Sequence, residues 1–321
     1  MKKNRNYVGI DISKLTFDVA MSKTDGNYAH YKFGNDAEGF KEFKKLLGKE
    51  NHCCVMEASG PYYLNLAFYL SERSIEVCVV NPLVIRRFSQ MRLMRAKTDK
   101  KDAATIAEYG KTEHPSPWQK EEDYVLELKQ MQAYVSQLSK SRTGIIRQKE
   151  AFAQNPVKCM SIFKSSNKIL KNIEKEIAII DAQMEKLVTQ YHQKMFDQLK
   201  SIPGLGKKTS MQLIVLSAGF TKFENSKQLS SYVGLSPRIF ESGTSVKGRA
   251  RICKMGMSRV RAMLYVCAWS AKKCNKACRE LYERLLAKGK SKKLALIAIT
   301  NKLLKQAFAI ATKKEFYLEN S

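Results

Sequence analysis

Four carboxylates in the first third of the chain have the types and spacing needed to hold divalent metal ions. Carboxylate oxygens are the ligands that Mg²⁺ and Mn²⁺ prefer, together with water and a substrate phosphate. Two such ions roughly 4 Å apart hold both the attacking and the leaving oxygen of a phosphoryl transfer. A magnesium or manganese site for this chemistry is therefore predicted at Asp11, Glu57, Asp99 and Asp102.

Asp11 and Glu57 belong to short apolar stretches that are typical of buried strands. Strand alternation places Asp11 on the same face as the small residues Gly9 and Ser13, which leaves room for an ion. Glu57 ends its apolar stretch, at the strand end where sheets of this class bind ligands. The alternative for each residue is an ordinary solvent-exposed carboxylate.

Asp99 and Asp102 stand three residues apart at the start of a predicted helix that runs to about Tyr109. Both side chains therefore project from one helix face, where a pair of carboxylates can chelate an ion. The alternative is that one of them caps the helix and interacts with its positive end.

The elements that must position these carboxylates follow one another as three strands, a helix, a strand, a helix, a strand and a helix. Residue alternation predicts the first strands, a short apolar run predicts a buried strand at 52–59, and three- and four-residue spacing predicts the helix at 36–47. The predicted strands are 7–13, 16–22, 28–34, 52–59 and 75–80, and the helices are 36–47, 60–72 and one from Leu83. This order, beginning with an antiparallel meander, predicts a ribonuclease-H-like mixed sheet with helices on its faces.

The rest of the chain is predicted to be mainly helical, which makes the whole an α/β plus α protein. From Tyr124 to Tyr191, apolar residues recur every three to four positions and predict two long helices, as in a coiled coil, with a break at Asn155-Pro156. A plain spacer and an arm that dimerises or holds RNA are equally compatible with this pattern.

A third segment begins near residue 199, where a glycine-containing turn leads into a predicted compact unit, 199–264. Mostly helical sequence follows at 258–287 and 291–312. The expected domains are a metal-binding catalytic domain at 1–118, a helical linker at 119–198 and a carboxy-terminal domain at 199–321.

The charge of the chain points to a polyanionic partner. Lys and Arg number 57 against 30 Asp and Glu, a net charge of +27. Residues 1–115 hold 19 basic and 14 acidic residues, which leaves 38 basic and 16 acidic in 116–321. No apolar run approaches the roughly 20 residues of a membrane span, and no signal-peptide core follows the first residues, so nucleic acid in the cytosol is favoured over a membrane.

Cysteine usage favours reduced, mostly buried thiols over a zinc site. Paired CxxC spacing is absent, and the chain has four His. Cys274 and Cys278 lie one helical turn apart, without a His close to them in the sequence. The eight cysteines are at positions 53, 54, 78, 159, 253, 267, 274 and 278.

Two groups of motifs run over nearly the full length of the chain. The amino-terminal motifs are Gly9-Ile10-Asp11-Ile12-Ser13, Met56-Glu57-Ala58-Ser59-Gly60-Pro61-Tyr62, Asn81-Pro82 and Lys97-Thr98-Asp99-Lys100-Lys101-Asp102-Ala103. The carboxy-terminal motifs are Ile202-Pro203-Gly204-Leu205-Gly206, Tyr232-Val233-Gly234-Leu235-Ser236-Pro237-Arg238, Glu241-Ser242-Gly243-Thr244-Ser245 and Arg251-Ile252-Cys253-Lys254-Met255-Gly256. Together these motifs resemble the insertion-sequence one-ten transposases and the pilin-gene invertases. Cys253, where a small polar residue is expected, departs from the pattern.

The resemblance implies a RuvC-type fold with an Asp-Glu-Asp-Asp metal tetrad on the four carboxylates. It also implies a catalytic serine, which maps to Ser242, with Ser245 and Ser236 as alternatives. Further implications are a transient phosphoserine bond to DNA, work as dimers and tetramers, and a structured noncoding RNA, the bridge RNA, that selects the element ends and the target. A bacterial cytoplasmic protein that associates with the nucleoid when bound to DNA is expected.

Basic residues around the expected serine are candidates for sequence-independent phosphate contacts. The turn at 202–206 resembles a helix-hairpin-helix turn, which offers backbone N–H groups to phosphate and is followed by two lysines. A solvated Gly/Ser/Arg loop is the alternative. The candidates are Arg238, Lys247, Arg249, Arg251, Lys254, Lys207 and Lys208.

The expected function is therefore that of a transposase or site-specific recombinase of a mobile element. One rival is a metal-dependent junction resolvase or nuclease, in which Ser242 is a structural turn residue. A second rival is a noncatalytic nucleic-acid scaffold whose carboxylates no longer bind metal. Mg²⁺-dependent strand breakage separates the scaffold from both enzymes, and a covalent protein–DNA adduct separates the recombinase from the nuclease.

Overall fold

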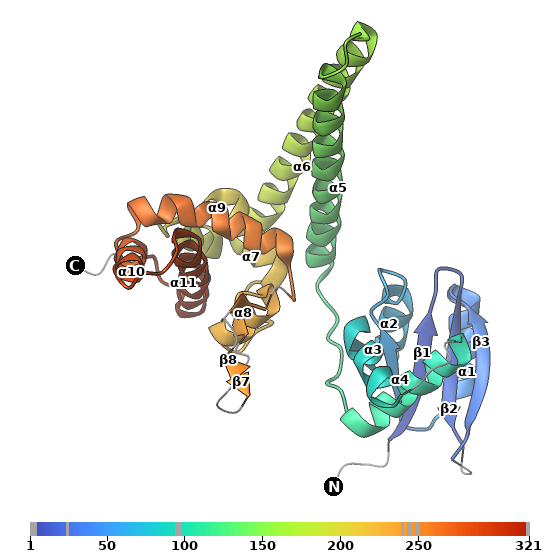
Figure 1. The fold of residues 1–321 in the computed structure, drawn as a ribbon. Helices are drawn as coiled ribbons and strands as arrows, with labels where there is room; N and C mark the ends of the chain where they lie inside the picture. Colours follow the sequence, from blue (N-terminus) through green and yellow to red (C-terminus); the bar gives the residue numbers. More distant parts are fainter. Residues whose placement is uncertain are drawn as a thin grey trace. The chain divides into compact units, whose positions relative to one another are not determined.

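The fold was determined as a computed structural model (Figure 1). The chain forms two units, residues 1–120 and 121–321. A further division of the second unit near residue 198, into a linker and a carboxy-terminal domain, stays a prediction. The structure describes residues 5–23, 26–93, 98–238, 241–242, 246–247, 251–253 and 255–318.

A mixed sheet of five strands forms the centre of the first unit. Its strands are β1 (Asn6–Ile12), β2 (Thr16–Ser22), β3 (Tyr28–Gly34), β4 (His52–Glu57) and β5 (Glu76–Val80). The spatial order is β3-β2-β1-β4-β5. The first three strands pair antiparallel, as the predicted meander requires, whereas β1 with β4 and β4 with β5 pair parallel. The mixed sheet is consistent with the predicted ribonuclease-H-like domain.

Helices cover both faces of this sheet. They are α1 (Ala37–Leu47), α2 (Leu64–Ser71), α3 (Pro82–Met91) and α4 (Asp99–Glu113). Alternate strand residues such as Ile10 pack in one core cluster with α1 and α2, and those such as Val55 pack in a second cluster with α3 and α4. The period of two along each strand therefore explains the three-layer arrangement.

Close contact between α4 and β1 depends on Gly9. A Cβ atom at this position would lie 2.0 Å from the carbonyl oxygen of Ala103 and 2.3 Å from the backbone nitrogen of Ala107. Such distances are far below van der Waals contact, so only glycine lets the helix backbone approach the strand here. This approach brings the first turn of α4 over the strand that carries Asp11.

The predicted helix at 60–72 begins later than expected. Residues 60–63 form a turn in which the backbone N–H of Leu64 donates to the carbonyl of Pro61, and α2 begins only at Leu64. Gly60 has a φ of +59°, a left-handed conformation that turns the chain sharply after β4. Pro61 therefore belongs to the turn and not to the first turn of the helix.

Two long helices begin the second unit, α5 (Asp123–Ala153) and α6 (Met160–Lys200). They lie side by side as a helical hairpin, with the predicted break at Asn155-Pro156 in the connection between them (Figure 1). His192 leaves helical geometry inside α6, with φ −140° and ψ 30°, which marks a kink. Coiled-coil packing of the pair stays a prediction.

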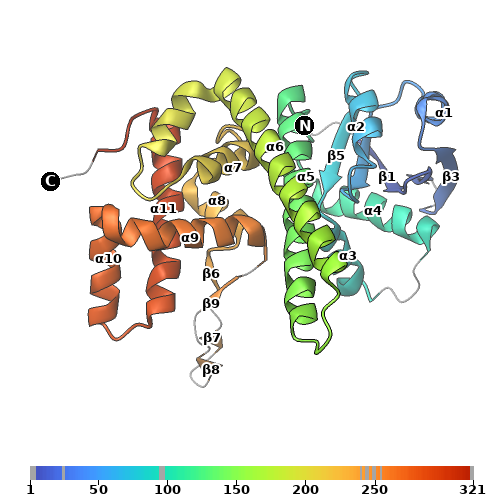
Figure 2. The same ribbon diagram turned by 90° about the horizontal axis from the view of Figure 1, so that it is seen from above.

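Helices and very short strands form the rest of the second unit (Figure 2). They are α7 (Lys207–Ser217), α8 (Ser226–Val233), β6 (Pro237–Arg238), β7 (Glu241–Ser242), β8 (Val246–Lys247), β9 (Arg251–Ile252), α9 (Ser258–Cys274), α10 (Lys276–Ala287) and α11 (Lys292–Lys313). The predicted helical stretch 258–287 is interrupted at Asn275, whose side chain caps α10. Their core includes residues of α5 and α6, such as Leu128 and Val188.

One described helix, α11, is long and apolar enough to cross a membrane by length and composition. Leu296, Ile299, Leu303 and Leu304 of this helix are nevertheless buried in the core of the second unit. The apolar character of α11 is thus explained by packing against α9 and α10.

Candidate active site

The four predicted carboxylates line one hollow of the first unit, with a volume of about 890 Å³. Asp11 comes from β1 and Glu57 from the end of β4. These strands are parallel neighbours in which Ile10 pairs with Met56, so the two carboxylates lie side by side. The first turn of α4 contributes Asp99 and Asp102.

The helix cap is a different residue. The side-chain oxygen of Thr98 accepts a hydrogen bond from the backbone N–H of Lys101 at 3.3 Å, so Thr98 is the N-cap of α4. The alternative in which Asp99 or Asp102 caps the helix is therefore wrong. Both aspartates instead line the hollow from the first turn.

Asp11 experiences the charges of the other three carboxylates. Burial is the main factor that raises the pKa of Asp11 from 3.8 to about 6, followed by repulsion from Asp102, Glu57 and Asp99. Concentrated negative charge of this kind is costly without a cation. The oxygen-rich donor set and this repulsion together fit a hard divalent ion, because an ion between the carboxylates would remove the repulsion.

Neutralising Asp11 should stabilise the metal-free protein. A raised carboxyl pKa means that the folded state binds more protons than the unfolded state between about pH 4 and 6, so stability falls as pH rises through this window. We expect Asp11→Asn to increase the free energy of unfolding by roughly 1 kcal/mol at pH 7, after allowance for solvent screening. Denaturant unfolding in EDTA measures the effect.

The control for this prediction is the pH dependence of the difference between the two proteins. The stability advantage of Asp11→Asn should shrink towards pH 4, because both proteins then carry a neutral group at position 11. An advantage that is equally large at pH 4 and pH 7 would show that repulsion at Asp11 is not its cause.

Neighbouring residues that the sequence did not single out complete the hollow. The hydroxyl of Ser59 donates to Oε1 of Glu57 at 2.9 Å, which orients that carboxylate. Arg86, on α3, lines the same hollow and supplies a positive charge close to where a phosphate would lie. Ser59 follows Glu57 by only two residues, so its contact with that carboxylate could have been predicted from the sequence. Nothing local in the sequence distinguishes Arg86 from the other arginines.

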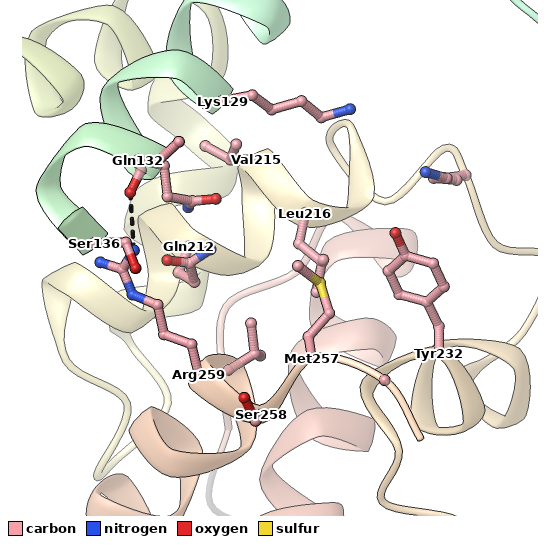
Figure 3. Close-up of a pocket in the computed structure, with 14 residues that line it drawn as sticks. Lys129, Gln132, Ser136, Gln212, Val215, Leu216, Tyr232, Met257, Ser258 and Arg259 are labelled. Atoms are coloured by element: carbon pink, nitrogen blue, oxygen red, sulfur yellow. Dashed lines mark hydrogen bonds between the residues drawn. The ribbon is translucent and has the colours of Figure 1, made fainter. Parts of the chain in front are cut away.

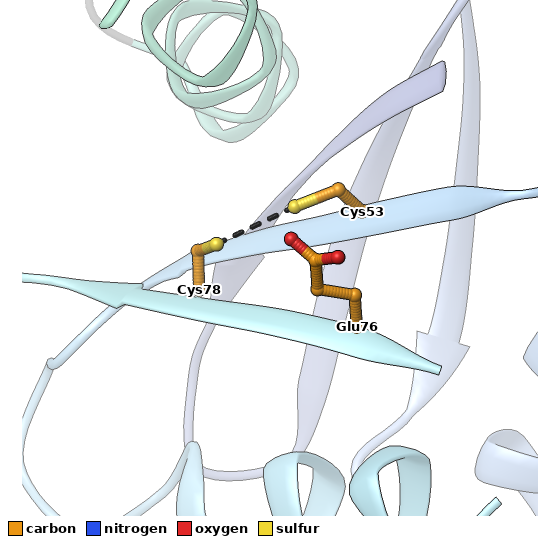
Figure 4. Close-up of side chains that lie close together, drawn as sticks. All are labelled: Cys53, Glu76 and Cys78. Atoms are coloured by element: carbon orange, nitrogen blue, oxygen red, sulfur yellow. Dashed lines mark hydrogen bonds between the residues drawn. The ribbon is translucent and has the colours of Figure 1, made fainter. Parts of the chain in front are cut away.

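A second group of ligand-type atoms lies at the opposite end of β4. Potential ligand atoms of Cys53, Glu76 and Cys78 lie within 4.8 Å of one another (Figure 4). The two sulfur atoms are 3.4 Å apart, and Glu76 accepts a hydrogen bond from Arg5 at 2.8 Å. Each group thus has a protein partner. Cys53, Cys54, Cys78 and Cys278 are buried as predicted, whereas Cys159 and Cys274 are exposed, so the prediction of buried thiols is wrong for these two.

The predicted serine belongs to the second unit. The backbone of Ser242 lies in β7 and pairs with Val246 of β8 in a short hairpin. Its side chain lies outside the described part of the structure, as does Ser245 altogether. The third candidate, Ser236, is half-buried, and its carbonyl accepts a hydrogen bond from the backbone N–H of Cys253 at 2.9 Å. The choice among the three stays a prediction.

Most of the predicted phosphate contacts also lie outside the described side chains. The backbones of Arg238, Lys247 and Arg251 belong to β6, β8 and β9, but their side chains are not described, and Arg249 and Lys254 are not described at all.

The two lysines after the glycine-containing turn have acidic partners on α6. Lys207 pairs with Glu185, and Lys208 pairs with Asp181. A Cβ atom at Gly204 would lie 2.6 Å from that of Ala271, so this turn packs tightly against α9. The glycine therefore has a packing role, and phosphate contact by the two lysines stays a prediction.

Comparisons with known proteins place both units among transposases. A family model described as a transposase, of the DEDD type of IS110, matches residues 8–154, and one described as the transposase IS116/IS110/IS902 family matches residues 197–283. The chain is 31% identical to the pilin gene-inverting proteins of Moraxella lacunata and Moraxella bovis, over 96% of each chain. It is 25% identical to a putative transposase of Sinorhizobium fredii, over 82% of this chain and 71% of the relative.

Proposed function

Because this chain belongs to the IS110 family of transposases, we propose that it cuts and rejoins DNA by metal-dependent phosphoryl transfer with a serine nucleophile. The observation that carries the metal-dependent part is the hollow lined by Asp11, Glu57, Asp99 and Asp102. These carboxylates would hold Mg²⁺ or Mn²⁺, which stabilises negative charge on the oxygens of the reacting phosphate.

The serine step is assigned to Ser242. Its hydroxyl oxygen would attack the phosphorus of one DNA strand, and the deoxyribose oxygen that leaves would take up a proton. The enzyme then holds the cut strand as a phosphoserine ester. Attack by a hydroxyl of the second DNA partner would reverse this step, release Ser242 with its proton and join the new strands without an external energy source.

The partners in this proposal are DNA at the element ends and target, a structured noncoding RNA, and further copies of this chain as a dimer or tetramer. The charge supports a polyanionic partner, because residues 116–321 contain 38 basic and only 16 acidic residues. The helical hairpin of α5 and α6 is a suitable arm for either RNA or a second copy. We place the protein in the bacterial cytoplasm, associated with DNA when active.

A recombination assay tests the proposal. Purified protein is incubated with two DNA substrates that carry the element end and the target, with Mg²⁺, and with or without the noncoding RNA transcribed from the flank of the element. A joined product that requires both Mg²⁺ and the RNA is expected. Joining without the RNA would remove the RNA from the proposal, and nicking without joining would favour a metal-dependent nuclease.

A further inference from the structure

A groove in the second unit is lined by residues other than the four carboxylates and Ser242 (Figure 3). Its volume is about 540 Å³, within the range of small-molecule sites. One face of α5, one face of α7 and the first turn of α9 form its walls, and Tyr232 of α8 lies at its side. We call it the amide groove, because two glutamine side chains line it.

The first observation is a buried amide nitrogen without a partner. Nε2 of Gln132, on α5, is buried and lacks a hydrogen-bond partner among the described residues. An unsatisfied buried amide costs about 1 to 3 kcal/mol, so it is rare unless a ligand or water completes it. Gln212, on α7, is 5% exposed and lines the same groove. Both amides are available to the same ligand.

The second observation is the positive charge of the groove. Lys129, Lys222 and Arg259 line it, and none of its described lining residues is acidic. Lys129 is paired with Glu121, and Arg259 donates to the carbonyl of Gln132 at 2.9 Å, so Lys222 is the most available cation.

The start of α9 adds to this charge. This helix of 17 residues begins in the groove, and its N-cap, Met257, makes no side-chain hydrogen bond to the first turn. The uncapped N–H groups and the helix dipole favour an anion at this place. Together with the cations, they point to a ligand that carries phosphate.

The third observation is an aromatic ring that lines the same groove. The ring of Tyr232 is 41% exposed, and the ammonium of Lys222 lies 5.2 Å from its centre. Met257 and Leu216 supply apolar contacts close to it. Aromatic rings of this kind stack on nucleobases, and amides form hydrogen bonds with base edges.

We propose that the amide groove binds one unpaired nucleotide of a DNA or RNA strand. Its base stacks on Tyr232, the base edge bonds to Gln212 and Gln132, and its phosphate lies at the start of α9 near Lys222. This assignment rests on the proposed function, since nucleic acid is the partner there. It adds a site that binds a strand at an unpaired position through residues other than the proposed catalytic ones.

Photocrosslinking locates the nucleotide directly. Single-stranded oligonucleotides with one 5-iodouracil, one series of DNA and one of RNA, are irradiated with the full-length protein, and the crosslinked peptide is identified by mass spectrometry. We expect the crosslink at Tyr232 or Met257. A preference for the DNA or the RNA series identifies which strand the groove holds.

Two substitutions separate binding from folding. Gln212→Met keeps the side-chain volume and removes an amide for which no hydrogen bond to the described residues is seen, so the melting temperature should stay nearly the same while the crosslink yield falls about tenfold. Tyr232→Ala should reduce the yield by a similar factor through loss of stacking. Tyr134→Ala, which removes a tyrosine that is 51% exposed on α5 outside the groove, is the matched control and should leave the yield unchanged.

The proposal is overturned if the crosslink maps outside the groove, or if Gln212→Met crosslinks as well as the unchanged protein. Water alone would then satisfy the amides. Failure of this kind in a protein that still joins DNA would leave the proposed function intact. Absence of any crosslink together with absence of recombination would contradict both.

Discussion

Replacing Asp102 by Asn should reduce the rate of DNA strand breakage by about a thousandfold or more. This corresponds to at least ~4 kcal/mol of lost transition-state stabilisation, the scale expected when a ligand of a catalytic ion is lost. Asp102 lines the hollow from the first turn of α4. The N-cap of this helix is Thr98, so the Asp102→Asn substitution should leave the helix intact. The initial rate of nicking of element-end DNA in Mg²⁺ measures the effect.

The matched control is Glu113→Gln at the other end of α4. This change also removes one carboxylate charge from the same helix, but Glu113 does not line the hollow. It should therefore retain nearly the full rate. Breakage by Asp102→Asn at more than a tenth of the rate of the unchanged protein would contradict a metal-ligand role for Asp102.

The second large effect is expected at Ser242. Ser242→Ala should abolish the covalent protein–DNA adduct and the joined product, because no other atom of residue 242 can form the phosphate ester. The adduct is detected on a denaturing gel after incubation with element-end DNA, the noncoding RNA and Mg²⁺. The unchanged protein should give a shifted band that protease removes.

Ser236→Ala and Ser245→Ala serve as controls for the position of the nucleophile. Each should form the adduct, and loss of the adduct in one of them alone would move the assignment to that serine. Mg²⁺-dependent cleavage without an adduct, in the unchanged protein and in Ser242→Ala alike, would instead support a nuclease that uses only the carboxylates.

The sheet of the first unit was predictable from two local patterns. Apolar residues alternate along β1 at Val8, Ile10 and Ile12, and β4 is a short apolar run that is buried along nearly its whole length. The short meander also follows from local turns. The start of α2 was not predictable to the residue, because Pro61 suits a tight turn and a first helical turn equally well.

Convergence of the four carboxylates was predicted from their residue types and spacing and from the motif resemblance, but the long-range packing that brings them together is not visible in the sequence. Gly9 illustrates the reason, since its role is to admit the backbone of α4, more than 90 residues later in the chain. Ion pairs between Lys207, Lys208 and α6 were likewise not visible in the sequence, because they depend on how α7 packs against α6. The amide groove has the same origin, with walls from α5, α7 and α9.

The acidic hollow also illustrates a conflict between stability and function. Burial and mutual repulsion raise the pKa of Asp11 to about 6, so the ionised Asp11 carboxylate destabilises the fold of the metal-free protein. A substitution that relieves the cost, such as Asp11→Asn, should strengthen the fold and remove the activity. Such opposite effects are characteristic of sites selected for chemistry and not for packing.

Iron-directed backbone cleavage tests the central claim, a single divalent-metal site made by the four carboxylates, without requiring DNA. Fe²⁺ replaces Mg²⁺, and ascorbate with peroxide generates radicals that cut the backbone next to the bound ion. We predict cuts near Asp11, near Glu57 and between Asp99 and Asp102, all suppressed by excess Mg²⁺. Cuts near Cys53 and Cys78 alone, or cuts that Mg²⁺ does not suppress, would contradict the assignment.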